Sequence, residues 1–173
     1  MRVKVFKKSL DKSEIIWYTV YRKRKEVIPM TKAINFDMDG TLCDFYGVEN
    51  WLEYLINRDA TPYAVAKPLL NLSALARKLN ALQREGYEIN IISWLAKNST
   101  EEFDEIVTET KKKWLKKHLP SVNWNKITIV AYGIDKSTLG NGILFDDEEL
   151  NRKMWGEGAY DVDDILGILS QVA

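Results

Sequence analysis

Short apolar runs alternate with segments of helical periodicity from residue 33 onward, and this alternation constrains the fold more than any other feature of the chain. Strands joined by helical crossovers pair in parallel, because a right-handed connection lays each helix on a face of the sheet. The sequence therefore predicts an α/β fold of three layers, in which helices cover a mainly parallel sheet. The predicted strands are residues 33–37, 88–93, 126–131 and 142–145, with a short fifth strand at 159–161.

Three helices are expected to cover this sheet. The first is capped by Ser73 and ends at Gly86. Its apolar stripe is Leu75, Ala76, Leu79 and Leu82. The second begins at a capping box, residues 99–102, and runs to Leu119, with acids first and lysines last as the helix dipole favours. Its buried face is expected to be Phe103, Ile106, Val107, Thr110, Trp114 and Leu115. Residues 162–171 form the third.

The chain has the length of one domain with a small insert. Its 173 residues are 46% hydrophobic, which is ordinary for a globular protein with a real core. We predict a main domain at residues 30–173 with a helical cap insert at about residues 44–72. Short helices are expected in that insert at 48–57 and 62–72, the second opened by Pro62 and limited in length by Pro68. Residues 1–29 are expected to form a β-hairpin-like appendage.

Basic residues are concentrated at the front of the chain. Its net charge is zero, but the first 32 residues hold ten Lys or Arg against three Asp or Glu. The basic run at residues 22–25 fits either a patch for a nucleic-acid backbone or a solvated strand end, and the second is the commoner origin of short charge runs. The rest of the chain is acidic, which fits a domain that holds a divalent cation.

Cysteine count and hydropathy set the expected compartment. The single cysteine, Cys43, excludes a disulfide within the chain. No apolar run approaches the roughly 18–20 residues that span a bilayer. The first residues lack the apolar stretch of a signal peptide. We therefore expect a cytoplasmic protein.

Two carboxylates, Asp37 and Asp39, stand two residues apart at the end of the first predicted strand. Such a pair is costly unless a cation sits between the carboxylates or one of them is protonated. Ligands of parallel sheets bind beyond the carboxyl ends of the strands. That rule brings Ser93, Asp146 and Asp147 to the same crevice. Hard oxygen ligands of this kind suit Mg²⁺, whereas one thiol and one imidazole are too few for a Cys/His zinc site.

Phosphoryl transfer is the chemistry that this crevice favours. With Mg²⁺ screening the charges, one carboxylate can attack phosphorus and form a covalent acyl-phosphate. The second acid can protonate the leaving oxygen and then deprotonate the water that hydrolyses the intermediate. A hydroxyl and a lysine would hold the non-bridging oxygens.

The motifs resemble those of a known superfamily. The run Asp37-Met38-Asp39-Gly40-Thr41-Leu42 matches the Asp-x-Asp-x-Thr signature of the haloacid dehalogenase-like (HAD) phosphohydrolases. Ser93 fits their second motif, and Asp146-Asp147 fits the fourth. Residues 37–45 and 135–147 are most similar to segments of the 5′(3′)-deoxyribonucleotidase family.

This resemblance covers roughly residues 32–150. It implies a Rossmann-like, HAD-like fold and a Mg²⁺-dependent phosphomonoesterase that acts on nucleotides through an aspartyl-phosphate. The acids Glu148 and Glu149 stand where relatives often carry a basic residue, which makes the rim of the site more negative.

Roles carried over by motif are specific to single residues. Asp37 would be the nucleophile and a Mg²⁺ ligand, and Asp39 the general acid/base, with its backbone carbonyl a ligand too. Either Asp146 or Asp147 would complete the metal shell. The resemblance assigns phosphate binding to Thr41, Ser93 and Lys136.

Several other lysines compete with Lys136 for the phosphate. Lys136 is favoured because its spacing before Asp146 matches the family. Lys126 starts a strand, and Lys97 follows Ser93 closely enough to reach the phosphate. The remaining candidates lie on one helix and are expected to face solvent: Lys111, Lys112, Lys113, Lys116 and Lys117.

Aromatic residues surround the predicted phosphate site. Phe45 and Trp94 are the candidates for the substrate pocket, Phe45 because the resembling family has an aromatic residue there. Aromatic side chains beside a phosphate can stack a nucleobase, but they also pack small inserts. For Trp51 and Tyr54 we favour packing; Tyr46 and Tyr63 belong to the same group.

The expected partner is a small-molecule phosphomonoester, a nucleoside monophosphate above all, and the chain could pair as a homodimer. Two alternatives are a phosphatase for nucleic-acid ends, gripped by residues 22–25, and a phosphatase for another phosphometabolite. A third is a binding module that keeps the fold without turnover. The intact carboxylates argue against that module, because they are costly to keep without a task.

Overall fold

The computed structural model describes residues 32–172 of the chain. The hairpin predicted for residues 1–29 and the basic run at 22–25 lie outside this described part. No helix within the described part is long and apolar enough to cross a bilayer.

A five-stranded parallel sheet forms the centre of the fold, in the order β5-β4-β1-β6-β7. Its strands are β1 (Ala33–Phe36), β4 (Glu88–Trp94), β5 (Lys126–Val130), β6 (Ile143–Phe145) and β7 (Ala159–Tyr160). The central strand β1 is fully buried, and its Ile34 is opposite Ile89 of β4 and Ile143 of β6. The predicted parallel α/β fold, including the short fifth strand, is confirmed.

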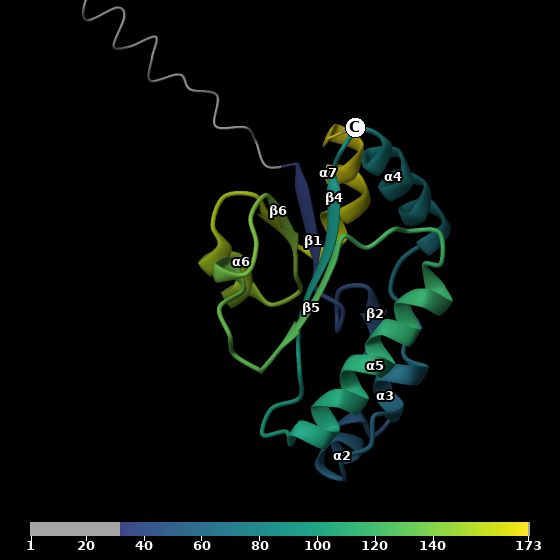
Figure 1. The fold of residues 1–173 in the computed structure, drawn as a ribbon, viewed down its shortest axis with the longest axis vertical. Coiled ribbons are helices and arrows are strands. Elements are labelled where there is room, and N and C mark those ends of the chain that lie inside the picture. The colour runs from purple at the N-terminus through teal and green to yellow at the C-terminus, as the bar shows by residue number, and fades with distance from the viewer. Residues whose placement is uncertain (1–31, 173) are drawn as a thin grey trace, which may run out of the picture. The chain divides into compact units, whose positions relative to one another are not determined.

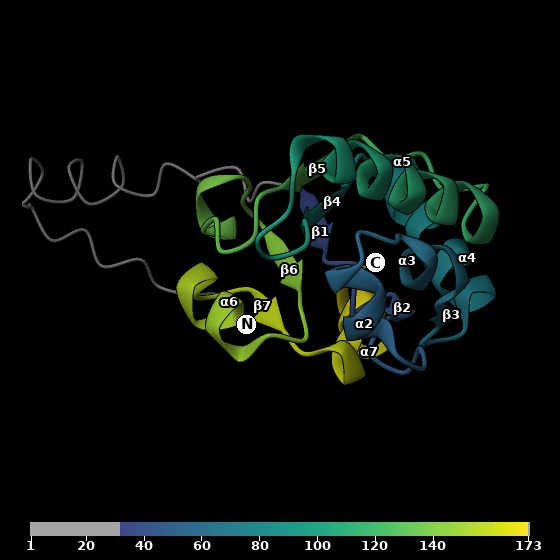
Figure 2. The ribbon, with the colours of Figure 1, turned by 90° about the horizontal axis from the view of Figure 1, so that it is seen from below.

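Helices cover both faces of this sheet (Figures 1 and 2). One face carries α4 (Leu72–Arg84), α5 (Glu101–His118) and α7 (Ile165–Val172), and the other carries α6 (Glu149–Trp155) with the short 3₁₀ helix η1 (Lys136–Thr138). A second 3₁₀ helix, η2 (Val162–Asp164), leads into α7, so the closing helix starts three residues later than predicted.

Successive side chains of β1 point to opposite faces of the sheet. Ile34 and Phe36 point into the main apolar core with the buried stripes of α4, α5 and α7, whereas Asn35 points to the other face. There the Asn35 amide donates to the carbonyls of Asn141 and Ile143 at 2.7 and 3.0 Å. These bonds fix the start of β6 and the residues before it to the central strand.

The insert after β1 is built from small pieces. Strands β2 (Cys43–Asp44) and β3 (Lys67–Pro68) pair antiparallel, and between them lie α2 (Trp51–Ile56) and α3 (Thr61–Val65), the latter packed on α5. The helix predicted at 62–72 is therefore wrong beyond Val65. Pro68 disfavours helical backbone in the residue before it, and the chain runs extended from Ala66. The helix predicted at 48–57 is likewise confined to α2.

Two predicted caps are displaced. The carboxamide of Asn71, and not the hydroxyl of Ser73, caps α4 by accepting from the Ala74 N–H at 3.0 Å. Thr100 caps α5 by accepting from the Phe103 N–H at 3.4 Å, so that helix begins one residue later than a capping box led by Ser99 would place it.

The buried face of α5 also differs from the prediction. Phe103, Val107, Trp114 and Leu115 are buried as expected. Ile106, however, is 54% exposed, and Lys111 is only 1% exposed. The lysine thus occupies a position on the inner face of the helix, where solvent was expected.

Candidate active site

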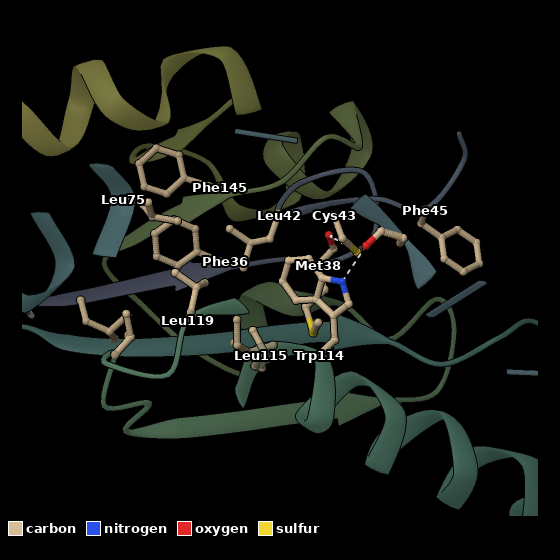
Figure 3. Close-up of a cluster of buried hydrophobic side chains, with 14 of the residues drawn as sticks. Phe36, Met38, Leu42, Cys43, Phe45, Leu75, Trp114, Leu115, Leu119 and Phe145 are labelled. Atoms are coloured by element: carbon tan, nitrogen blue, oxygen red, sulfur yellow. Dashed lines mark hydrogen bonds between the residues drawn. The ribbon is translucent and has the colours of Figure 1, made fainter. Parts of the chain in front are cut away.

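The loop after β1 is held by the core on one side and presents acids on the other. Met38 is buried between Asp37 and Asp39, among the side chains of Figure 3. Its carbonyl oxygen accepts the N–H groups of Thr41, Leu42 and Cys43 at 2.9–3.2 Å, which closes a tight turn. Because residues before and after Met38 point away from it, both carboxylates lie on the cavity side of the loop.

Lys136 joins two of the predicted site acids. Its ammonium lies 2.9 Å from Oδ1 of Asp37 and 2.7 Å from Oδ2 of Asp146, and all three side chains are buried. Burial acts to lower the pKa of Lys136, but the attraction of Asp37 and Asp146 outweighs it, so the pKa is raised. The lysine is therefore a fixed positive charge beside the proposed nucleophile.

Asp146 and Asp147 follow β6 and have different partners. The Asn151 amide on α6 donates to both Asp146 carboxylate oxygens at 3.1 and 3.2 Å. Burial, and then the charge of Asp37, raises the Asp146 pKa despite Lys136. Arg152 donates to the backbone carbonyls of Asp146 and Asp147 at 2.7 Å each, which fixes the turn.

Asp147 forms a reciprocal pair with Thr41. The Thr41 hydroxyl donates to Oδ1 of Asp147 and accepts the Asp147 N–H, both at 3.1 Å. Burial raises the pKa of Asp147 to about 7, with the charges of Asp37 and Asp146 adding to it. Thr41 itself is completely buried. Its phosphate-binding role stays a prediction; the contact that the structure gives is with Asp147.

Three carboxylates form a candidate cation site. Asp37, Asp146 and Asp147 each offer an oxygen, and these oxygens lie within 4.8 Å of one another. The donor set is entirely hard oxygen, which fits Mg²⁺ and not a thiophilic metal. Burial first, and then the charges of the neighbouring carboxylates, raise the pKa values of Asp146 and Asp147, and a bound cation would offset both effects. The residues present therefore fit a divalent cation.

Ser93 and Lys111 meet at Asp39. Ser93 is fully buried near the end of β4, and its hydroxyl oxygen accepts from the Lys111 ammonium at 2.8 Å. The same ammonium lies 2.7 Å from Oδ2 of Asp39. Burial, opposed by Lys111 and aided by the charge of Asp37, raises the pKa of Asp39.

Lys111 is thus a site residue that the sequence reasoning placed in solvent. A signal for it was present, because Lys111 is four residues after Val107 and four before Leu115, on the apolar stripe of α5. The rival lysines behave as expected: Lys126 is exposed at the start of β5, and Lys112 pairs on the surface with Glu109.

A cavity of about 550 Å³ opens beside the acids. It reaches Asp37, Asp39 and Lys136 at its base, and the insert and the loop after β4 form its walls. Its aromatic lining is Phe45, Tyr46, Trp51, Tyr63, Trp94 and Tyr132. Cations at its edge are Arg58 and Lys97, the latter 5.6 Å from the centre of the Tyr132 ring.

The aromatic residues both pack and line the cavity. Phe45 is buried and lies 4.6 Å from Tyr63 and 5.5 Å from Trp51, measured between ring centroids. The rings of Trp94 and Tyr132, also in the lining, are 4.9 Å apart, and the Trp94 indole donates to the Ile134 carbonyl at 2.9 Å. The same aromatic side chains therefore pack against one another and line the cavity.

Comparisons with known proteins give little further guidance. No family model matches the chain, and no curated protein matches it. Among solved structures, it is similar to the D,D-heptose 1,7-bisphosphate phosphatase from Burkholderia thailandensis, with 10% identity and a TM-score of 0.46. The match covers 81% of this chain and 97% of that chain.

Proposed function

We propose that this protein is a HAD-type phosphatase, a metal-dependent phosphomonoesterase that works through an aspartyl-phosphate on Asp37. The observation that carries the proposal is the setting of the Asp37 carboxylate. It lies at the end of the central strand, 2.9 Å from a buried lysine, within reach of two further carboxylates, and at the base of a cavity.

Asp37 begins the reaction as the nucleophile. A carboxylate oxygen of Asp37 bonds to phosphorus as the bond from phosphorus to the substrate alcohol breaks. Lys136 and the Ser93 hydroxyl hold the non-bridging oxygens, on which charge gathers in the transition state. The ammonium of Lys136 already lies beside Asp37, so it needs no large movement to serve the phosphate.

Asp39 moves the protons. It gives its proton to the departing alcohol oxygen and then takes a proton from the water that attacks the acyl-phosphate. That attack breaks the bond between phosphorus and Asp37 and releases inorganic phosphate. The raised pKa of Asp39 favours the protonated form that the first step requires.

Asp37, Asp146 and Asp147 would hold the cation, which we propose to be Mg²⁺, and the Asp39 carbonyl is a further candidate ligand. When bound, the ion neutralises charge between the carboxylates and the phosphate dianion. Hydrogen bonds from Thr41, Asn151 and Arg152 hold the two acids after β6 in place, which supports this assignment.

We propose a nucleoside monophosphate, a deoxynucleotide first, as the substrate. A cavity of about 550 Å³ is within the range of small-molecule sites. Its aromatic walls offer flat faces on which a nucleobase can stack. The floor of the cavity next to them carries the phosphate-binding groups. Arg58 and Lys97 add positive charge at the edge, which offsets Glu148.

Phosphate release from a panel of phosphomonoesters tests the proposal. Wild type should release phosphate from nucleoside monophosphates with Mg²⁺ and stop in EDTA. Asp37→Asn should lower the rate at least a thousandfold, because the amide is not a nucleophile. Lys112→Met, on the surface, is the matched control and should retain activity. Equal rates for wild type and Asp37→Asn would show that the mechanism is wrong. Activity on other phosphate esters but not on nucleotides would contradict only the proposed substrate.

A further inference from the structure

Lys111 has an environment that the proposed chemistry does not yet explain. The lysine of the phosphate site is already supplied by Lys136. Lys111 lies on α5, is 1% exposed, and donates to three acceptors. These are Oδ2 of Asp39 at 2.7 Å, the Ser93 hydroxyl oxygen at 2.8 Å and the Trp94 carbonyl at 2.6 Å. An ammonium has three N–H groups and no acceptor, so all of its donors are used.

Such a lysine is expensive as a purely structural element. Removing an ammonium from water is unfavourable, and the attraction of one buried partner offsets this cost only with good geometry. An apolar residue of similar length would continue the stripe of Val107 and Leu115 without that cost. The Tyr63 ring, whose centroid is 5.0 Å from the ammonium, offsets only part of that desolvation cost. The charge therefore indicates a task at Asp39 and Ser93.

The direction of the hydrogen bonds specifies that task. Because Ser93 accepts from Lys111, its own hydrogen is free to be donated elsewhere, as a phosphate-binding hydroxyl requires. Because Oδ2 of Asp39 also accepts from Lys111, a proton on Asp39 belongs on Oδ1. Within the described part of the chain, the hydrogen bond that Oδ1 accepts is a long one, 3.9 Å from the Cys43 thiol.

We infer that Lys111 is a positioning residue, which rests on the proposed phosphatase function. It directs the Ser93 hydroxyl toward the phosphate and leaves Oδ1 as the oxygen through which Asp39 transfers its proton. The bond to the Trp94 carbonyl fixes the ammonium to the end of β4, so both groups are oriented relative to the sheet. The side chain of Asp39 remains 16% exposed at the cavity, within reach of a leaving oxygen.

Aryl phosphates of similar size test this inference. Phenyl phosphate has a more basic leaving oxygen than 4-nitrophenyl phosphate, so its cleavage depends more on proton donation. The parameter is kcat/KM, which reports on formation of the aspartyl-phosphate. In Lys111→Met, the ratio of kcat/KM for phenyl over 4-nitrophenyl phosphate should fall about tenfold relative to wild type. A loss common to both substrates reports on Ser93.

Controls separate positioning from damage to the fold. The ratio is taken on one preparation, so the fraction of active enzyme cancels, and Lys111→Gln repeats the test with a donor but no charge. Lys112→Met, whose side chain is 44% exposed on the same helix, should keep the wild-type ratio. Asp39→Asn should lower the ratio, and adding Lys111→Met to it should lower it no further.

Two results would overturn the inference in different ways. If Asp39→Asn lowers the ratio but both Lys111 variants keep it, Lys111 does not act through Asp39, and the phosphatase proposal stands. If the wild type cleaves no aryl phosphate and no nucleotide with Mg²⁺, the proposed function fails and the role of Lys111 fails with it.

Discussion

Gly40 shows how closely single residues are fitted around the carboxylates. Its φ is +79°, and a Cβ built there would lie 2.3 Å from Oδ2 of Asp147. A side chain at this position therefore strains the backbone and displaces a candidate metal ligand at once. Gly86 has a similar φ of +89° but open space around its Cβ position, so it isolates the backbone effect.

We expect Gly40→Ala to lower both stability and Mg²⁺-dependent activity. The left-handed backbone alone costs about 1–2 kcal/mol for a residue with a Cβ, and the contact with Asp147 adds to it. Gly86→Ala should lose only the backbone part and keep its activity. Urea unfolding and phosphate release measure the two effects. Equal losses of activity in the two variants would contradict the role given to Asp147.

At the same scale, the sequence brought together most residues of the candidate site but not all. Asp37, Asp39, Ser93, Asp146 and Asp147 could be placed together because strand ends of a parallel sheet share an edge. Lys111 was missed despite its place on the apolar stripe of α5, because it stands in a run of three lysines that is typical of a solvated surface. What makes its burial possible is Asp39, which is 72 residues away in the chain.

Helix boundaries show the limit of sequence reasoning at the scale of elements. Ser73 and Asn71 are both good capping residues, and only the backbone decides between them. Asn71 has the extended conformation of an N-cap, and Ser73 lies inside the first turn of α4. The early end of α3 has two causes: Pro68 disfavours helical backbone before it, and β3 pairs with β2, a contact that the local sequence does not contain.

Substitution of these two residues distinguishes the caps. Asn71→Ala should lower the free energy of unfolding by about 1 kcal/mol, because it leaves the Ala74 N–H without its acceptor. Ser73→Ala should change it by less than about 0.5 kcal/mol, since alanine is the better helix former. Urea midpoints at a constant m value measure both. A larger loss of unfolding free energy in Ser73→Ala than in Asn71→Ala would show that Ser73 is the cap, as the sequence predicted.

The stability of the whole molecule should depend on pH through the acid cluster. Without a cation, Asp147 has a pKa of about 7 in the folded protein against an ordinary value of 3.8. A raised pKa means that the folded state binds the proton more tightly. Its contribution to stability is thus full below about pH 4 and is lost as the pH rises through 7.

Thermal unfolding in EDTA between pH 5 and pH 8 measures this dependence. The Tm of wild type should fall with rising pH more steeply than that of Asp147→Asn, which cannot titrate there. Added Mg²⁺ should raise the wild-type Tm most above pH 7, where protons no longer compete for the carboxylates. Parallel curves for the two proteins in EDTA would contradict the raised pKa of Asp147 in the folded state.

Helix α2 has no buried residue, yet its Trp51, Leu52, Leu55 and Ile56 line the cavity. Substitutions along that helix can reshape the cavity while the core and the reacting groups on the sheet remain as they are. The residues that shape the cavity and the residues proposed to react therefore lie on different elements of the chain. Under the proposed function, substitutions in this six-residue helix would change which phosphate esters bind and would leave the groups that cleave them in place.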